Sequence, residues 1–159
     1  MKKLFMALLC AVGVSSAAFA AGGDMALGVQ MSHASSANQL GLGVKFQCEL
    51  VDAFRIEPSF NYYFENANWS AWDVNVNLHY VINVVNKFDV YPLAGIGYSN
   101  WKLDLGSDTS YNQDRFAFNL GAGAEFDISD RIALTAELRY QVMKTYGQMA
   151  TSLGVKYRF

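Results

Sequence analysis

From Met25 to Phe159, apolar and polar residues alternate over eight consecutive segments of the chain. A period of two is the repeat of a β-strand, because successive side chains point to opposite faces of a sheet. The apolar phase is rich in Phe, Trp, Tyr, Leu, Ile and Val and contains no Asp, Glu, Lys or Arg, although 16% of all residues are charged. The predicted strands cover residues 24–32, 39–49, 53–65, 71–83, 87–101, 114–127, 131–143 and 148–159.

The opposite phase carries the charge of these segments. Its charged residues are Lys45, Arg55, Glu57, Asp73, Asp89, Arg115, Glu125, Glu137, Arg139, Lys156 and Arg158. Each segment is about as long as a strand that crosses a bilayer, and one face of every strand is apolar. The pattern therefore predicts an all-β fold, an eight-stranded antiparallel up-and-down transmembrane β-barrel with its apolar face in lipid.

A soluble, lipocalin-like barrel that binds a small hydrophobic ligand is the alternative, with the apolar face turned inward. The interior of an eight-stranded barrel is only wide enough for side chains to fill it or for one small ligand. The aromatic residues on nearly every strand would overfill that space. The polar face fits it better because it is rich in glycine, at Gly28, Gly41, Gly43, Gly95, Gly97, Gly121, Gly123 and Gly154.

The connections between the predicted strands alternate in length. Those after the second, fourth and sixth strands are short, at residues 50–52, 84–86 and 128–130, whereas residues 33–38, 66–70, 102–113 and 144–147 form longer polar loops. Outer-membrane barrels have short periplasmic turns and longer extracellular loops. We therefore expect both termini in the periplasm.

Aromatic residues gather near both ends of the strands, as expected for rings at the two membrane interfaces. The long-loop group is Tyr62, Phe64, Trp69, Trp72, Tyr98 and Trp101, and the short-turn group is Phe46, Phe54, Phe88, Phe126, Tyr157 and Phe159. Pro58 and Pro92 lie inside strands, and a closed barrel has no edge to accommodate a proline. Each should mark a bulge or a missing ladder bond, and a bulge would shift the strand phase by one residue.

The N-terminal residues have the pattern of a secretory signal peptide. Lys2 and Lys3 precede an apolar run, and Ala18-Phe19-Ala20 forms a small-x-small cleavage site. We expect a cleaved peptide at 1–20 and a single barrel domain at 21–159. Without Lys2 and Lys3, ten basic residues remain against fourteen acidic ones, and no basic patch indicates a nucleic-acid partner. The remaining cysteine, Cys48, lies in the apolar phase, where it acts as a small hydrophobe.

Charged residues of both signs should meet inside the barrel. Counting residues along each strand from its short-turn end places Lys45, Glu57, Glu125 and Lys156 at one level, with His79 close by. Glu137 and Arg139 lie slightly further from the short turns. Buried charges persist when they are paired. We predict a salt-bridged plug, with Lys45–Glu57 as the leading contact, and keep a narrow or gated ion path as the alternative.

Enzymatic chemistry has one candidate. Lipid A-modifying barrels would need a Ser/His pair near the outer leaflet. Ser32 and His33, with Ser35 and Ser36, lie at a long-loop end, but no acidic residue is close in sequence to orient the histidine. The two histidines and the cysteine have no metal-site spacing. We therefore predict a non-enzymatic protein without a cofactor.

Glycine and aromatic residues alternate in Tyr91-Pro92-Leu93-Ala94-Gly95-Ile96-Gly97-Tyr98 and Gly121-Ala122-Gly123-Ala124-Glu125-Phe126, and the chain closes with Tyr157-Arg158-Phe159. In these segments the sequence resembles the small outer-membrane β-barrel family that includes outer membrane protein X and the barrel domain of outer membrane protein A. The resemblance covers the mature chain and implies a location in the bacterial outer membrane. It also implies that Tyr157 and Phe159 form a C-terminal signal for the barrel-assembly machinery.

The expected role is structural: a monomeric envelope protein in contact with outer-membrane lipids that supports membrane integrity. Exposed loops on a rigid scaffold are common binding sites. An adhesin-type module is therefore an alternative, with an unknown extracellular partner bound through the loop 102–113. The residues proposed to bind it are Lys102, Asp104, Asp108 and Tyr111.

Overall fold

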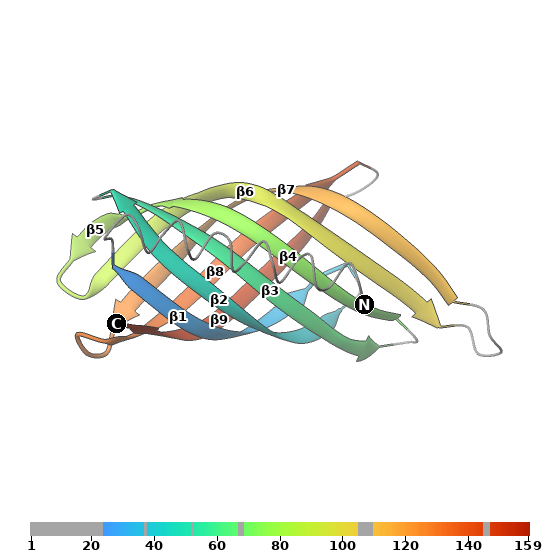
Figure 1. Ribbon diagram of the computed structural model, residues 1–159, viewed down its shortest axis with the longest axis horizontal. Coiled ribbons are helices and arrows are strands. Elements are labelled where there is room, and N and C mark those ends of the chain that lie inside the picture. Colours follow the sequence, from blue (N-terminus) through green and yellow to red (C-terminus); the bar gives the residue numbers. More distant parts are fainter. Residues whose placement is uncertain (1–23, 37, 52, 67–68, 105–109, 145–146) are drawn as a thin grey trace.

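The computed structural model describes residues 24–36, 38–51, 53–66, 69–104, 110–144 and 147–159, which form one antiparallel sheet closed into a barrel (Figure 1). The strands are β1 (Met25–Ala34), β2 (Gln39–Val51), β3 (Phe54–Asn66), β4 (Trp69–Tyr80), β5 (Ile82–Val85), β6 (Phe88–Asp104), β7 (Ser110–Asp127), β8 (Ile132–Met143) and β9 (Gly147–Arg158). Apart from β4 and β5, strands that are neighbours in the chain pair with each other, and β1 pairs with β9. Because β5 continues β4 after Val81 and both pair with β6, the nine segments make an eight-stranded barrel, as predicted.

Pro92 causes the interruption between β4 and β5. His79 pairs with Leu93 and Ile82 pairs with Val90, so the register is the same on both sides of the gap. The amide of Val81 bonds to Ala53 on the β3 side, so the backbone groups of Tyr80 face β6. Proline has no N–H to complete that pair.

Pro58 produces the same effect between β2 and β3. Backbone pairing is absent at Phe46 and Gln47 of β2, which lie opposite Pro58 and Glu57. On both sides of this gap the strands keep the same register. Both prolines therefore remove ladder bonds without forming a bulge, and the predicted strand phase is correct through them.

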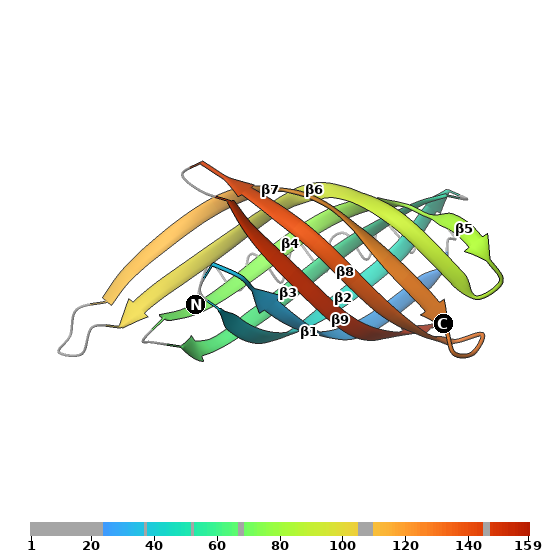
Figure 2. The ribbon, with the colours of Figure 1, turned by 180° about the vertical axis from the view of Figure 1, so that it is seen from behind.

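The apolar phase faces outward around the whole barrel. Val29, Ile96, Phe118 and Leu153 are each at least 60% exposed, whereas the charged residues of the other phase are largely buried. Figure 2 shows the same sheet from behind, where β7, β8, β9 and β1 continue the wall. The soluble, ligand-binding alternative is therefore wrong, because the apolar phase faces outward and the charged phase faces the interior.

Two predicted interface aromatics lie inside the barrel instead. Trp101 is buried against Ala34, Tyr63 and Ala71, and Trp69 packs on the same group. Trp69 and Trp101 were predicted at the membrane interface because they lie near strand ends. Both belong to the inward phase of β4 and β6, and this phase decides the direction of their side chains. This group, the apolar cap, lies at the long-loop end of the lumen.

The long loops are shorter than predicted because strand pairing continues beyond the apolar segments. Lys102 pairs with Asn112 and Asp104 with Ser110, so three of the four predicted binding residues (Lys102, Asp104 and Tyr111) lie on strands. Asp108 lies outside the described residues, which resume at Ser110. The hairpin of β6 and β7 nevertheless extends furthest at this end of the barrel in Figure 1.

The first strand begins and the last strand ends at the short-turn rim, where Ala26 pairs with Arg158. Within the described residues, no helix is long and apolar enough to cross a membrane. The predicted signal peptide, residues 1–20, lies outside the described residues.

Candidate functional site

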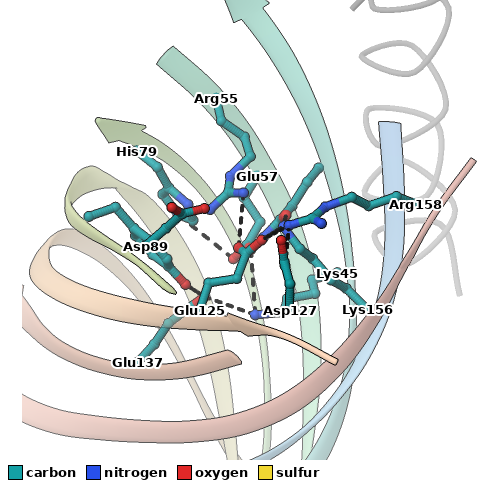
Figure 3. A network of polar contacts seen from close by, with 12 residues as sticks. Lys45, Arg55, Glu57, His79, Asp89, Glu125, Asp127, Glu137, Lys156 and Arg158 are labelled. Carbon is teal, nitrogen blue, oxygen red and sulfur yellow. Dashed lines mark hydrogen bonds and ion pairs between the residues drawn. The ribbon is translucent and has the colours of Figure 1, made fainter. Parts of the chain in front are cut away.

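The lumen is filled by polar side chains that the alternating strands point inward. All seven residues predicted for the plug are at most 4% exposed: Lys45, Glu57, His79, Glu125, Glu137, Arg139 and Lys156. Each comes from an inward position, so the strand period places it there. The residues form successive clusters along the barrel axis, two of which Figure 3 shows.

The cluster nearest the short turns is centred on Glu125 of β7. Its carboxylate accepts bonds from Arg55 Nη1 at 3.1 Å and Lys156 Nζ at 2.5 Å, and it also contacts Arg158. Arg158 reaches Asp127 at 2.7 Å, at the rim. One carboxylate therefore joins cations from β3 and β9 across the barrel, as oppositely charged groups must when buried.

The next cluster is centred on Lys45. Its ammonium lies 2.8 Å from Glu137 Oε1 and 3.6 Å from Glu57 Oε2. The predicted Lys45–Glu57 contact is thus present, but Glu137 of β8 is the closer partner. Glu57 was predicted as the partner because its strand follows that of Lys45 across a tight turn. Only barrel closure brings Glu137 within reach of Lys45.

Tyr91 completes this cluster and was missed by the sequence analysis. Its hydroxyl donates to Glu137 Oε1 at 2.8 Å, and its ring stacks on His79 with centroids 4.5 Å apart. The ring also covers Gly123, where a Cβ atom would lie 2.4 Å from it. The sequence could have indicated this position, because Tyr91 lies between Val90 and Pro92 of the apolar phase and therefore points inward.

Gln47 connects the two charged clusters. It accepts a bond from Lys156 Nζ at 2.7 Å and donates through Nε2 to Glu57 Oε2 at 2.5 Å. A neutral amide can do both because it carries a donor and an acceptor. Gln47 was not among the predicted residues, since amides give no charge signal in a sequence.

Above the charged clusters, the lumen contains amides and Asp73. The Asp73 carboxylate accepts bonds from Asn61 and Asn75, both at 2.7 Å, and from the Tyr63 hydroxyl at 3.0 Å. Arg139 interacts with Asp73 and Tyr63.

An amide ladder then leads toward the apolar cap. Asn119 donates to Asn75 at 3.0 Å and to Asn77 at 2.9 Å, and Gln148 donates to Gln141 at 2.6 Å. These bonds join β4 to β7, on either side of β6, and β8 to its neighbour β9.

The serine and histidine residues proposed for catalysis do not form a pair. Ser32 is buried in the lumen and donates to Asn61, whereas His33, on the other face of β1, contacts Asn38 at 2.9 Å. Ser36 donates to Gln148 at 2.5 Å. The geometry gives no support to a Ser/His nucleophile at this end of the barrel.

Tyr157 and Phe159 lie at the short-turn rim with 44% and 64% of their surfaces exposed. Arg131 donates to the Tyr157 hydroxyl at 3.1 Å. Both rings face the side of the barrel that carries the other apolar residues. Their role as an assembly signal stays a prediction.

The sequence matches the model of the outer membrane protein beta-barrel domain over residues 6–159. The chain belongs to this family. That membership places the barrel in the bacterial outer membrane, in agreement with the resemblance found in the sequence. No match is found among curated proteins.

Three solved barrels are similar to this one. The N-terminal barrel domain of Pseudomonas aeruginosa OprF has a TM-score of 0.74 and 19% identity, covering 86% of this chain and 98% of that one. Neisserial surface protein A has a TM-score of 0.69 and 16% identity, covering 87% and 97%. Ail of Yersinia pestis has a TM-score of 0.64 and 20% identity, covering 86% and 97%. At these identities the likeness shows the fold alone.

Proposed function

We propose that this barrel is a non-conducting structural protein of the outer membrane, monomeric, with both chain ends in the periplasm. The polar network that crosses the lumen carries the proposal. Among the described residues, charged clusters lie at the short-turn side of the lumen and an apolar cluster of buried side chains lies at the other end, which supports a closed lumen. Opening such a path would leave buried charges unpaired, which is costly.

Conductance measurements test whether the lumen is closed. The protein is inserted into planar bilayers, and we expect no stable current steps for the wild type at neutral pH. A double variant, Glu125→Gln with Arg55→Gln, removes a cross-lumen ion pair and serves as the comparison. Regular single-channel steps in the wild type would contradict the proposal and favour an ion path.

The envelope role is tested in a strain that lacks the gene. We expect increased sensitivity to detergents and bulky hydrophobic antibiotics, with rescue by the full chain. A variant in which residues 102–113 are replaced by a short turn should rescue equally, because the lumen network remains. An unchanged sensitivity in the deletion strain would remove the support for a structural role.

A partner-binding role is the second candidate, and the length of one hairpin favours it. With 17 and 18 residues, β6 and β7 are the longest described strands, and they extend the barrel at the side opposite the start of β1 and the end of β9. One solved structure of Ail, a fold neighbour at 19% identity, is a complex with the heparin analogue sucrose octasulfate. For a binding role, the short-turn variant should fold but lose adhesion, whereas a structural role predicts no loss.

A further inference from the structure

Three side chains from separate strands converge in the lumen. Glu57 of β3, His79 of β4 and Glu137 of β8 each offer one ligand atom, and these atoms lie within 4.8 Å of one another. All three are at most 4% exposed. Figure 3 labels all three residues together with Lys45.

His79 faces this group without a hydrogen-bond partner. It is 0% exposed, and neither ring nitrogen is bonded to any residue that the structure describes. Its Nε2 lies 3.9 Å from Glu57 Oε1, an oxygen that is equally unpartnered within the described chain. Buried polar atoms normally have a hydrogen-bond partner. The unbonded Nε2 of His79 and Oε1 of Glu57 face each other, which indicates that a further group binds between them.

The neighbouring contacts hold these ligand atoms in place. Tyr91 stacks on the imidazole at an interplanar angle of 11°, and its hydroxyl bonds to Glu137. Gln47 holds the other oxygen of Glu57, Oε2, and so leaves Oε1 facing the histidine. In metal sites, hydrogen bonds of this kind from surrounding residues orient the side chains that bind the ion.

We propose that Glu57, His79 and Glu137 bind one divalent transition-metal ion of the Zn²⁺ class. Imidazole nitrogen and carboxylate oxygen coordinate such ions at about 2.0–2.2 Å, so an ion placed between Nε2 and Oε1 contacts both after a small adjustment. An imidazole ligand disfavours Mg²⁺ and Ca²⁺, which take oxygen ligands.

Lys45 sets the affinity of this site. Its ammonium lies 2.8 Å from Glu137 Oε1 and 3.6 Å from Glu57 Oε2, so it partly neutralises the charge of both carboxylates. With a neutral imidazole, the group of Lys45, Glu57 and Glu137 carries a formal charge of −1. Removing the ammonium makes the charge −2, which matches a divalent ion and ends the repulsion between two cations.

The test is metal binding by the protein folded into detergent micelles with Zn²⁺ or Co²⁺ present. Bound Zn²⁺ is counted after gel filtration, and Co²⁺ is followed by its visible absorption. We expect one ion per wild-type barrel, and binding weaker by about tenfold or more in His79→Gln and Glu57→Gln. The matched control is His33→Gln, the only other histidine, which should bind as the wild type does.

Lys45→Met supplies a second, opposite readout. We expect it to bind about tenfold tighter than the wild type or better, a result that adventitious surface binding does not produce. Folding of each variant is checked by the mobility of unheated samples in electrophoresis. Equal binding by His79→Gln, loss of binding in His33→Gln, or no binding by either wild type or Lys45→Met would overturn the proposal. If His79→Gln does not fold, the comparison of wild type, His33→Gln and Lys45→Met decides.

Discussion

Glu137 and Glu57 differ in how much they contribute to the charged lumen. Glu137 is bonded to both Lys45 and Tyr91, whereas Glu57 is bonded to Gln47 and lies further from Lys45. Glu137→Gln should therefore cost about 3–5 kcal/mol of folding free energy. Glu57→Gln should cost about 1–3 kcal/mol, because Lys45 keeps its closer partner.

Urea unfolding in lipid vesicles measures both values. Asp130→Asn, in the exposed turn between β7 and β8, is the control and should change stability by less than about 0.5 kcal/mol. A larger loss for Glu57→Gln than for Glu137→Gln would show that Lys45 pairs mainly across the neighbouring strand.

Gly123 is required by a close approach of the Tyr91 ring. A Cβ atom there would lie 2.4 Å from the ring, so Gly123→Ala has to displace Tyr91 and weaken its bond to Glu137. We expect a loss of about 1–3 kcal/mol. In a Tyr91→Ala background the same substitution should cost much less, and unfolding of the four proteins gives the coupling. Equal losses in both backgrounds would mean that the ring is not the obstacle.

At the scale of the strands, Pro92 leaves a local weakness between β4 and β6. Pro92→Ala supplies the missing N–H opposite Tyr80 and should join β4 and β5 into one strand. The expected gain is about 0.5–1.5 kcal/mol, reduced by the lost rigidity of proline. Amide hydrogen exchange at residue 92 checks it: slow exchange indicates the new bond, and fast exchange with unchanged stability would contradict it.

The strands were predictable in number, order and phase, but less so at their ends. The apolar alternation stops where the bilayer is expected to end, whereas backbone pairing continues in β6 and β7 through residues rich in Asp, Asn and Ser. Pairing depends on the partner strand and not on hydrophobicity. The predicted loop 102–113 was therefore too long, and Trp69 and Trp101 were assigned to the wrong face by proximity to a strand end.

At the scale of the whole molecule, the outward apolar surface should report membrane depth. Leu120→Arg lies near the middle of β7 on the exposed face and should cost about 2–4 kcal/mol in lipid. Phe126→Arg lies on the same face near the short-turn rim and should cost only about 0–1 kcal/mol. The comparison uses unfolding in vesicles. Equal costs at the two depths would argue against the assumed position of the bilayer.

A closed barrel should also resist detergent as one unit. Unheated protein from outer-membrane fractions should migrate as a compact band in electrophoresis and shift after boiling, because the ladder from β1 to β9 has no free edge. The chain with β9 truncated at residue 147 is the control and should not show the compact band. A wild-type chain without a heat-dependent shift would contradict closure.

The sequence by itself determined the fold class, the eight-stranded count, the outward apolar face and the set of charged residues in the lumen. These follow from a period of two, which is a local property of the backbone and survives both prolines. Only the tertiary structure decided which of those residues meet. Closure brings Glu137 to Lys45 and places Gln47 between the two charged clusters. The register of neighbouring strands sets Tyr91 over Gly123 and His79 toward Glu57. Strand order along the chain fixes neighbours, but contacts across the lumen depend on the register and tilt of every strand together.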